Sequence, residues 1–268
     1  MVSRRTRKSR RSTSGISLAS LAVWSLAALV AVGSVSAYVL LKKEPLDNQT
    51  MCPRSGPDGI TIVLLDVSDP LSLAQSEKLN RLLTDKKSPV VPRGHRLDVY
   101  LLPEVNSKPK KIISICNPGS FELASNVEKL NKNQRKFQVE WRTFLKQVET
   151  IKNQTNLSAE NSTSPISESI DYVTSSSFPN NEATTGNPEL YKLVLISDML
   201  QNSNQLSVFT GEVTQSSDIN HALYFGGETH VYQLLSERYR VKQTSDLILF
   251  WEKQFIKAGS KLMRWEKW

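Results

Sequence analysis

Two aspartates that end apolar runs are the residues of this chain best suited to chemistry. Residues 60–66 read ITIVLLD and residues 190–198 read LYKLVLISD, so the two runs stop at Asp66 and Asp198. Apolar, β-branched runs without polar alternation are typical of strands buried on both faces of a parallel sheet. The carboxyl ends of neighbouring strands in such a sheet form the edge where ligands bind. Two carboxylates brought together there are suited to a hard cation.

The rest of the chain supplies the elements that would position these carboxylates. Strands are predicted at 96–102 and 111–117, and the connection between them is too short for a crossover helix, so this pair is expected to be antiparallel. A last strand is expected at 229–235. Helices are predicted at 71–83, at 121–151, from Pro165 through Val173 with Ser164 as N-cap, and at 245–258. This order predicts a three-layer α/β sandwich around a mostly parallel, doubly wound sheet.

An uncharged segment precedes this domain. Residues 16–41 carry no charge and are long enough, at about 1.5 Å per residue, to cross a bilayer as one transmembrane helix. Six basic residues precede the segment and two follow it, which predicts a cytosolic tail (1–15) and an exported remainder. The expected order is therefore tail, membrane anchor (16–41), stalk (42–59) and domain (60–268), in the inner membrane of a bacterium with the domain in the periplasm. A cleaved signal peptide, with a processing site near residues 35–37, is the alternative.

The distribution of charge and the missing motifs exclude several functions. The net charge is +8, but eight basic residues without an acid lie in residues 1–43, which leaves no net charge for residues 44–268. A domain of this kind has no electrostatic reason to bind nucleic acid. The three histidines lack zinc-binding spacing, and the common hydrolase and nucleotide-binding motifs are absent from the sequence. We therefore expect a protein that is not an enzyme.

Three short motifs resemble the von Willebrand factor A-type domain, and they occur in its order. Residues 66–70 (DVSDP) resemble its D-x-S-x-S motif, residues 164–170 (SPISESI) resemble T-P-[IL]-x-E-A-[IL], and residues 196–198 (ISD) end a later strand with aspartate. The resemblance extends over residues 60–268. It implies a doubly wound fold with one antiparallel edge strand and a metal-ion-dependent adhesion site.

The resemblance also implies a ligand set for Mg²⁺ or Mn²⁺. The expected metal ligands are Asp66, Ser68, Ser164 and Asp198, with Thr163 and Asp69 as further donors. Pro70 departs from the family pattern, because it replaces a serine whose hydroxyl would bind the ion. In the family a partner's carboxylate commonly completes the coordination, so the resemblance implies that this domain recognises an unknown protein partner, in part through an acidic residue. The alternatives are a metal-free structural subunit of an envelope assembly and aspartates that only cap helices or turns.

The two cysteines, Cys52 and Cys116, are too few for a metal cage, and they are either paired or two free thiols. The resemblance favours pairing. If the strand at 111–117 is the antiparallel edge strand, its end lies where the stalk enters the first strand. A disulfide would then tie the stalk to the domain.

Overall fold

A computed structural model of the chain describes residues 18–41, 46–86, 89–102, 107–122, 124–126, 129, 134–155, 163–178, 187–204, 206–209 and 227–268. The chain divides into two compact units, Met1–Glu44 and Pro45–Trp268. The expected basic tail lies outside the described residues, as does the connection at residues 210–226.

The first unit contains one helix. Helix α1 spans Leu18–Leu41, and its described side chains, those of residues 23–34 and 36, are exposed. Searched over the described residues alone, the chain has no helix that combines the length and the apolar character needed to span a membrane.

A six-stranded sheet with the order β3-β2-β1-β4-β5-β6 forms the centre of the second unit. The strands are β1 (Gly59–Leu65), β2 (His95–Leu101), β3 (Lys110–Cys116), β4 (Tyr191–Ser197), β5 (Glu228–Gln233) and β6 (Lys261–Lys267). Strand β3 runs antiparallel to β2, and the other neighbouring pairs are parallel. The predicted fold class, a mostly parallel α/β sheet with one antiparallel edge strand, is therefore confirmed.

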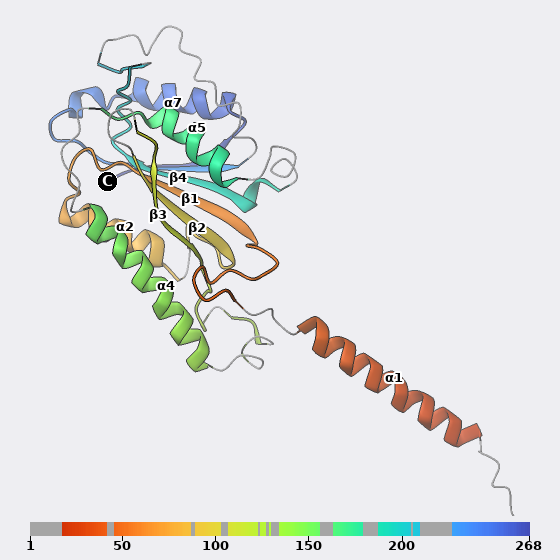
Figure 1. Ribbon diagram of the computed structural model, residues 1–268. Helices are drawn as coiled ribbons and strands as arrows, with labels where there is room; N and C mark the ends of the chain where they lie inside the picture. The colour runs from red at the N-terminus through yellow and green to blue at the C-terminus, as the bar shows by residue number, and fades with distance from the viewer. Residues whose placement is uncertain are drawn as a thin grey trace, which may run out of the picture. The chain divides into compact units, whose positions relative to one another are not determined.

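Helices lie on both faces of this sheet (Figure 1). One face packs against α2 (Leu73–Thr84) and α4 (Gln134–Thr155), and the other packs against α5 (Ile166–Ser177) and α7 (Ser245–Lys257). Each face has its own core of buried apolar side chains, because residues of a strand alternate between the faces. Val63 and Val194 lie in the core under α2 and α4, and Leu64 and Leu195 lie in the core under α5 and α7.

Two expectations about the elements were wrong. Strand β6 was not expected, because its sequence KLMRWEK is charged and most of its side chains are exposed, as on an edge strand. The helix expected at 121–151 differs at both ends, because the chain turns at Phe121 and Glu122 and α4, which spans Gln134–Thr155, continues past Ile151. Between these parts, the described residues Asn126 and Lys129 are helical. The apolar stripe that its spacing predicts faces the core, with Phe137, Phe144 and Val148 buried and Trp141 and Leu145 half-buried against them.

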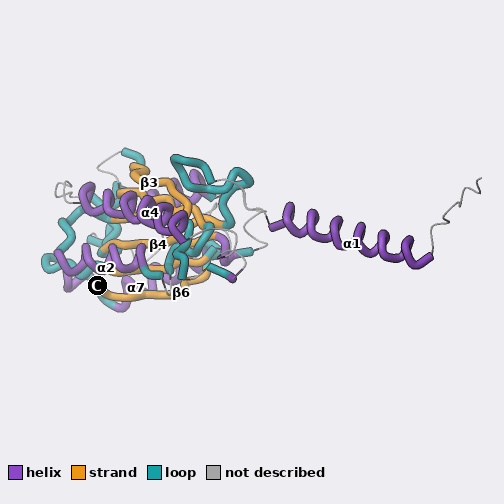
Figure 2. Tube along the Cα trace, turned by 90° about the horizontal axis from the view of Figure 1, so that it is seen from below, coloured by secondary structure: helices purple, strands orange, loops and turns teal. Residues whose placement is uncertain are grey.

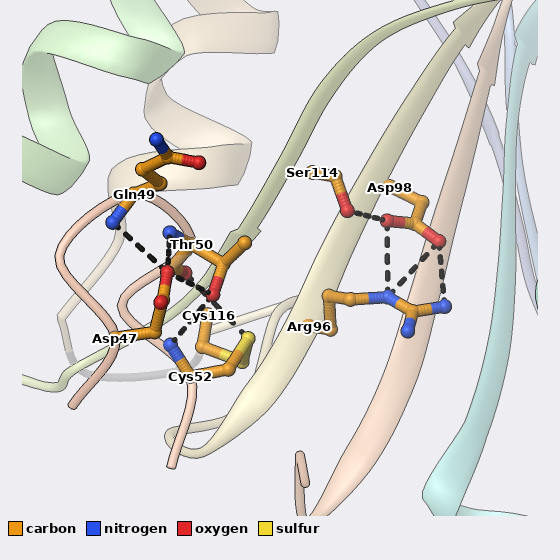
Figure 3. Close-up of a disulfide and its surroundings, with 8 residues drawn as sticks. All are labelled: Asp47, Gln49, Thr50, Cys52, Arg96, Asp98, Ser114 and Cys116. Carbon is orange, nitrogen blue, oxygen red and sulfur yellow. Dashed lines mark hydrogen bonds and ion pairs between the residues drawn. A yellow bond between two sulfur atoms is a disulfide. The ribbon is translucent and has the colours of Figure 1, made fainter. Parts of the chain in front are cut away.

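A buried carboxylate joins β2 to the edge strand β3. Asp98 is fully buried and accepts hydrogen bonds from Arg96 and from the hydroxyl of Ser114 (Figure 3), with Lys111 3.3 Å away. Burial raises the pKa of Asp98, but the Ser114 hydrogen bond and the charges of Arg96 and Lys111 outweigh it, so the pKa lies below its ordinary value. Arg96 also donates to the carbonyl of Ser177, which ends α5. The ion pair therefore fixes the end of α5 against the sheet.

The predicted disulfide is present. Cys52 and Cys116 are bonded across a sequence separation of 64 residues, with a Cα–Cα distance of 4.9 Å (Figure 3). Next to it, Asp47 accepts hydrogen bonds from the backbone N–H groups of Gln49 and Thr50, and the N–H of Cys116 donates to the carbonyl of Thr50 at 2.7 Å. The final part of the expected stalk thus lies against the end of β3.

Removal of this disulfide should lower stability strongly. In the chain-entropy model, opening a loop of this length lowers the free energy of unfolding by about 4 kcal/mol. We expect this fall for the full-length Cys52→Ala/Cys116→Ala variant in urea unfolding, and the reduced wild-type protein serves as the matched control. A fall of less than about 1 kcal/mol would show that the bond does not constrain the unfolded chain in the way that the model assumes.

Candidate functional site

The structure brings Asp66 and Asp198 to one edge of the sheet. Asp66 directly follows β1, Asp198 directly follows β4, and these two strands are parallel neighbours. The strand order runs outward in both directions from this pair, so the topology of the sheet reverses between β1 and β4. In open α/β sheets the crevice outside the carboxyl ends of the strands at such a switch point is the usual ligand site.

Asp66 joins three separate segments of the chain. Its side chain is buried, and its Oδ2 accepts hydrogen bonds from the hydroxyls of Ser164 at 2.9 Å and of Ser197 at 2.8 Å. Its Oδ1 accepts one from the backbone N–H of Ser68 at 3.0 Å. The carboxylate therefore holds the turn after β1, the segment before α5 and the end of β4 in one place.

Asp198 lies beside this group in an unfavourable setting for a charge. Burial first, and then the negative charges of Asp66 and Asp69, raise the pKa of Asp198 to about 8, although the backbone N–H of Leu200 donates to it at 2.8 Å. Without a counter-charge, Asp198 therefore keeps its proton at neutral pH. A cation at this edge would stabilise the charged form and displace the proton.

The remaining predicted ligands differ in position. Ser68 and Thr163 are half-buried, whereas Asp69 is exposed, as is Pro70, which supplies no ligand. The Thr163 hydroxyl oxygen is buried without a hydrogen-bond partner among the described residues. Asp69 affects Asp198 through its charge. The expected role of Ser164 as a helix N-cap was wrong, since α5 begins at Ile166 with Pro165 as its N-cap residue and the Ser164 hydroxyl donates to Asp66 instead.

Ser197 takes part in the site and was not expected from the sequence. Its hydroxyl donates to Asp66 and accepts the backbone N–H of Met199 at 2.9 Å. A signal was present, because Ser197 is the one hydroxyl in the buried part of β4, at a position otherwise suited to an apolar residue. A polar group at such a position needs a hydrogen-bond partner, and the neighbouring strand end supplies it.

Helix α5 holds the loop that follows Asp198. Gln201 is fully buried, its Oε1 accepts the backbone N–H of Ser167 at 2.9 Å, and its Nε2 donates to Glu168 at 2.9 Å. The hydroxyl of Ser203 also donates to Glu168. This network gives Glu168, the acid of the second motif, a clear structural role.

Helix α7 and the turn before it hold the same loop from the other side. The indole N–H of Trp251 donates to the carbonyl of Met199 at 2.9 Å, and Gln243 Nε2 donates to the carbonyl of Asp198 at 3.0 Å. Met199 has a positive φ of 63°, which turns the chain sharply after Asp198. The backbone that carries the Asp198 carboxylate is therefore fixed by contacts on both sides.

The oxygen atoms at this edge suit a hard cation that binds few protein groups and keeps several water ligands. Asp66 has used three of its roughly four lone-pair sites, and Asp198 has used one in the hydrogen bonds above. The hydroxyls of Ser68 and Thr163 lie in the adjoining segments. Among the described residues, no group of three or more His, Cys, Asp or Glu is arranged to hold a metal ion. An ion here would depend on hydroxyls, water or a ligand for its remaining coordination.

No protein-family model and no curated protein matches the chain. Solved structures with some similarity include the ArnB paralog VWA2 from Sulfolobus acidocaldarius (12% identity, TM-score 0.33, covering 67% of this chain and 36% of that one). They also include the human COPII-coat protein Sec24c (13%, 0.35, 78% and 30%) and proximal thread matrix protein 1 from the mussel byssus (14%, 0.33, 80% and 49%). The chain spans less than half the length of each of these proteins. The fold is therefore defined by this chain's own strand order.

Replacement of Asp198 by Asn should change how stability depends on pH. In metal-free buffer the folded chain keeps the Asp198 proton up to about pH 8, whereas the unfolded chain loses it near the ordinary pKa of 3.8. The contribution of this group to the free energy of unfolding is therefore present at low pH and is lost as pH rises through this window. We expect Asp198→Asn to gain stability relative to wild type as pH rises through this window, by about 1.4 kcal/mol for each pH unit and so by up to about 6 kcal/mol at pH 8 and above.

Urea unfolding across this range of pH measures the difference between the two proteins. Glu149→Gln, on the exposed face of α4, is the matched control for the loss of one carboxylate. Parallel pH profiles for wild type and Asp198→Asn would show that Asp198 ionises normally in the folded chain.

Proposed function

We propose that this chain is a membrane-anchored A-type domain that binds a protein partner at the Asp66–Asp198 edge of its sheet. The observation that carries the proposal is the cluster at the switch point, where the buried Asp66 holds two serine hydroxyls and the neighbouring Asp198 has a raised pKa. A pair of acids of this kind, one buried and the other half-buried, is costly without a cation or a proton between them. The binding of a cation and a partner is a reason to keep both.

The cation that suits this edge is Mg²⁺ or Mn²⁺. Asp66 and Asp198 would supply charge, and the hydroxyls of Ser68, Ser164 and Thr163 would supply neutral oxygens, as the D-x-S-x-S resemblance implies. Pro70 removes one hydroxyl from this set, which leaves more of the coordination to water and to the partner. A small divalent ion accepts such an arrangement, because it usually binds one or two carboxylates and keeps several other ligands.

A binding role suits these side chains better than catalysis does. The site residues are carboxylates and hydroxyls, and they include no histidine or cysteine that would activate a nucleophile. An acidic side chain of a partner protein is the ligand that would complete the coordination of a bound ion. The hydrogen bonds that hold the loop after Asp198 from both sides would keep the position of the Asp198 carboxylate constant for such recognition.

The proposed location of the domain is outside the cytosol, on an inner-membrane anchor with a cytosolic N-terminus. The support is the uncharged segment 16–41, the six basic residues before it and the disulfide between Cys52 and Cys116. Disulfides persist in oxidising compartments such as the bacterial periplasm. Export followed by cleavage of a signal peptide would also explain the disulfide, and it would release the domain from the membrane.

A metal-free structural subunit is the second candidate function. One observation favours it, because Asp66 is already satisfied by Ser164, Ser197 and Ser68, and a protonated Asp198 needs no cation. Pro70 also favours this candidate, because it lacks the hydroxyl that would bind an ion. In this case the cluster would only join the strand ends to α5.

Titration with metal ions separates the two candidates. If Mg²⁺ or Mn²⁺ binds the folded full-length chain, the melting temperature must rise with the ion concentration. When the ion concentration is one hundred times the dissociation constant, the free energy of unfolding increases by about 2.7 kcal/mol. We expect this rise to be lost in Asp198→Ala and kept in the control Glu149→Gln. We also expect tighter binding at pH 8 than at pH 6, because the ion must displace the Asp198 proton. An unchanged melting temperature up to millimolar ion would favour the metal-free candidate.

Site-specific crosslinking tests for the partner directly. A photo-crosslinking side chain at the exposed position 69, in cells that produce the full-length chain, should form a defined adduct with another protein. The same group at position 149, on the exposed face of α4, is the control. We expect the adduct at position 69 to be lost in Asp198→Ala. Equal adducts at the two positions would argue against recognition at this edge.

A further inference from the structure

The face of the sheet that packs against α2 is apolar at its centre and polar toward β6. Val63, Val99 and Val194 lie in the core on this face. Farther along the same face, Lys192 pairs in register with Glu228, and His230 pairs in register with Arg264. Polar side chains on inner strands need a reason, because an apolar residue covered by a helix would be more stable there.

A pocket of about 740 Å³ lies between this polar area and α2. Lys78 and Arg81 of α2 line one side, and Lys192, Tyr232 and Arg264 of the sheet line the other, with Trp268 at the end of the chain. Figures 1 and 2 both show the C-terminus beside α2. The volume lies in the range of small-molecule sites. Neither Asp66 nor Asp198 lines this pocket, so it is separate from the site described above.

The pocket has an excess of positive charge. Its described lining residues include the cations Lys78, Arg81, Lys192 and Arg264 and two carboxylates, Asp85 and Glu266. Lys192 is neutralised by Glu228, which lies 3.0 Å away, so the cations open to a ligand are Lys78, Arg81 and Arg264. Arg264 lies 3.5 Å from Glu266, and Arg81 lies 3.9 Å from Glu77, and both pairs are exposed. Exposed ion pairs of this kind contribute little to stability, so a bound anion can replace the carboxylate as the partner of each cation.

The inner wall carries a polar group without a partner. Lys192 forms a largely buried ion pair with Glu228 at 3.0 Å. His230 Nε2 is 3.7 Å from the same carboxylate, which is too long for a hydrogen bond, and it has no hydrogen-bond partner among the described residues. Burial and the charge of Lys192 lower the pKa of His230, so its ring is neutral at pH 7.

Aromatic side chains form another part of the pocket wall. The rings of Tyr232 and Trp268 are 4.8 Å apart, and the ammonium of Lys78 lies 5.9 Å from the centre of the Trp268 ring. Leu82 and Val90 add apolar surface to the lining. Cations therefore lie next to an apolar and aromatic wall in one open pocket.

Protection of the edge strand does not explain this arrangement. Charged residues on an edge strand prevent unwanted pairing with other strands, and this accounts for the exposed Lys261 and Lys267 of β6. Lys192 and His230 lie on β4 and β5, which are paired on both sides and have no free edge. Their side chains are mostly buried and face the pocket.

We propose that this pocket binds a small organic anion, in which a carboxylate or phosphate group meets the cations of α2 and β6 while an aromatic or apolar body packs against Tyr232 and Trp268. This site is independent of the proposed metal and partner site. Failure of one proposal therefore leaves the other intact.

Calorimetric titration of the full-length chain tests the proposal with four probes. Benzoate and phenyl phosphate carry the two anionic groups on an aromatic body, benzyl alcohol is the neutral match, and inorganic phosphate is the anion without a body. We expect saturable binding of at least one aromatic anion, about tenfold tighter than that of benzyl alcohol or of inorganic phosphate, since each group adds its own interaction. The stronger of the two aromatic anions identifies the anionic group.

Two variants show where the anion binds. Lys78→Gln and Arg264→Gln remove exposed cations from opposite sides of the pocket, so both variants should fold with unchanged melting temperatures. We expect each to weaken the binding about fivefold or more, and the control Lys253→Gln on the exposed face of α7 to leave it unchanged. Three outcomes would overturn the proposal: no saturable binding of either aromatic anion at millimolar concentration, equal binding of benzyl alcohol or inorganic phosphate, or binding that the two variants do not affect.

Discussion

The carboxylate of Asp66 is a charge held inside the protein, and the arrangement of the functional edge follows from the need to satisfy it. A buried carboxylate is tolerated only when donors surround it, and here the donors come from the turn after β1, the segment before α5 and the last residue of β4. Meeting this need sets the distance between β4 and the start of α5. It also places Asp198 next to a negative charge, which adds to the effect of burial in raising the pKa of that residue.

The loop after Asp198 extends this constraint to both helices that cover the same face of the sheet. Gln201 and Glu168 connect the loop to α5, and Trp251 connects it to α7. Each contact satisfies a buried polar group, so loss of one would leave its partner unpaired at a cost of about 1–3 kcal/mol. A displacement of either helix would therefore move the Asp198 carboxylate. The edge acts as one preorganised unit, which is the property that recognition of a partner requires.

The sequence predicts those parts of the fold that depend on local pattern. The apolar runs ending at Asp66 and Asp198, the short connection before β3 and the position of Cys116 each follow from short-range rules. Strand β6 was missed because its partner is β5, and its own residues read as exposed and charged. Ser197 was missed for a related reason. Its hydroxyl in a buried strand signals the need for a partner, but that partner is Asp66, which is 131 residues away in sequence, and no local pattern identifies it.

Strand β4 connects the two candidate sites, since Lys192 near its start lines the pocket and Asp198 follows its end. Asp198 lies six residue steps after Lys192, which corresponds to about 20 Å at the usual rise of a strand. At this distance two unit charges interact by less than about 1 kcal/mol at an effective dielectric constant of about 20, so a charge bound at one site has little direct electrostatic effect at the other. Coupling would have to pass through movement of β4, which is hydrogen-bonded to β1 and β5 along its length. Two sites of opposite charge can therefore work independently on one rigid sheet.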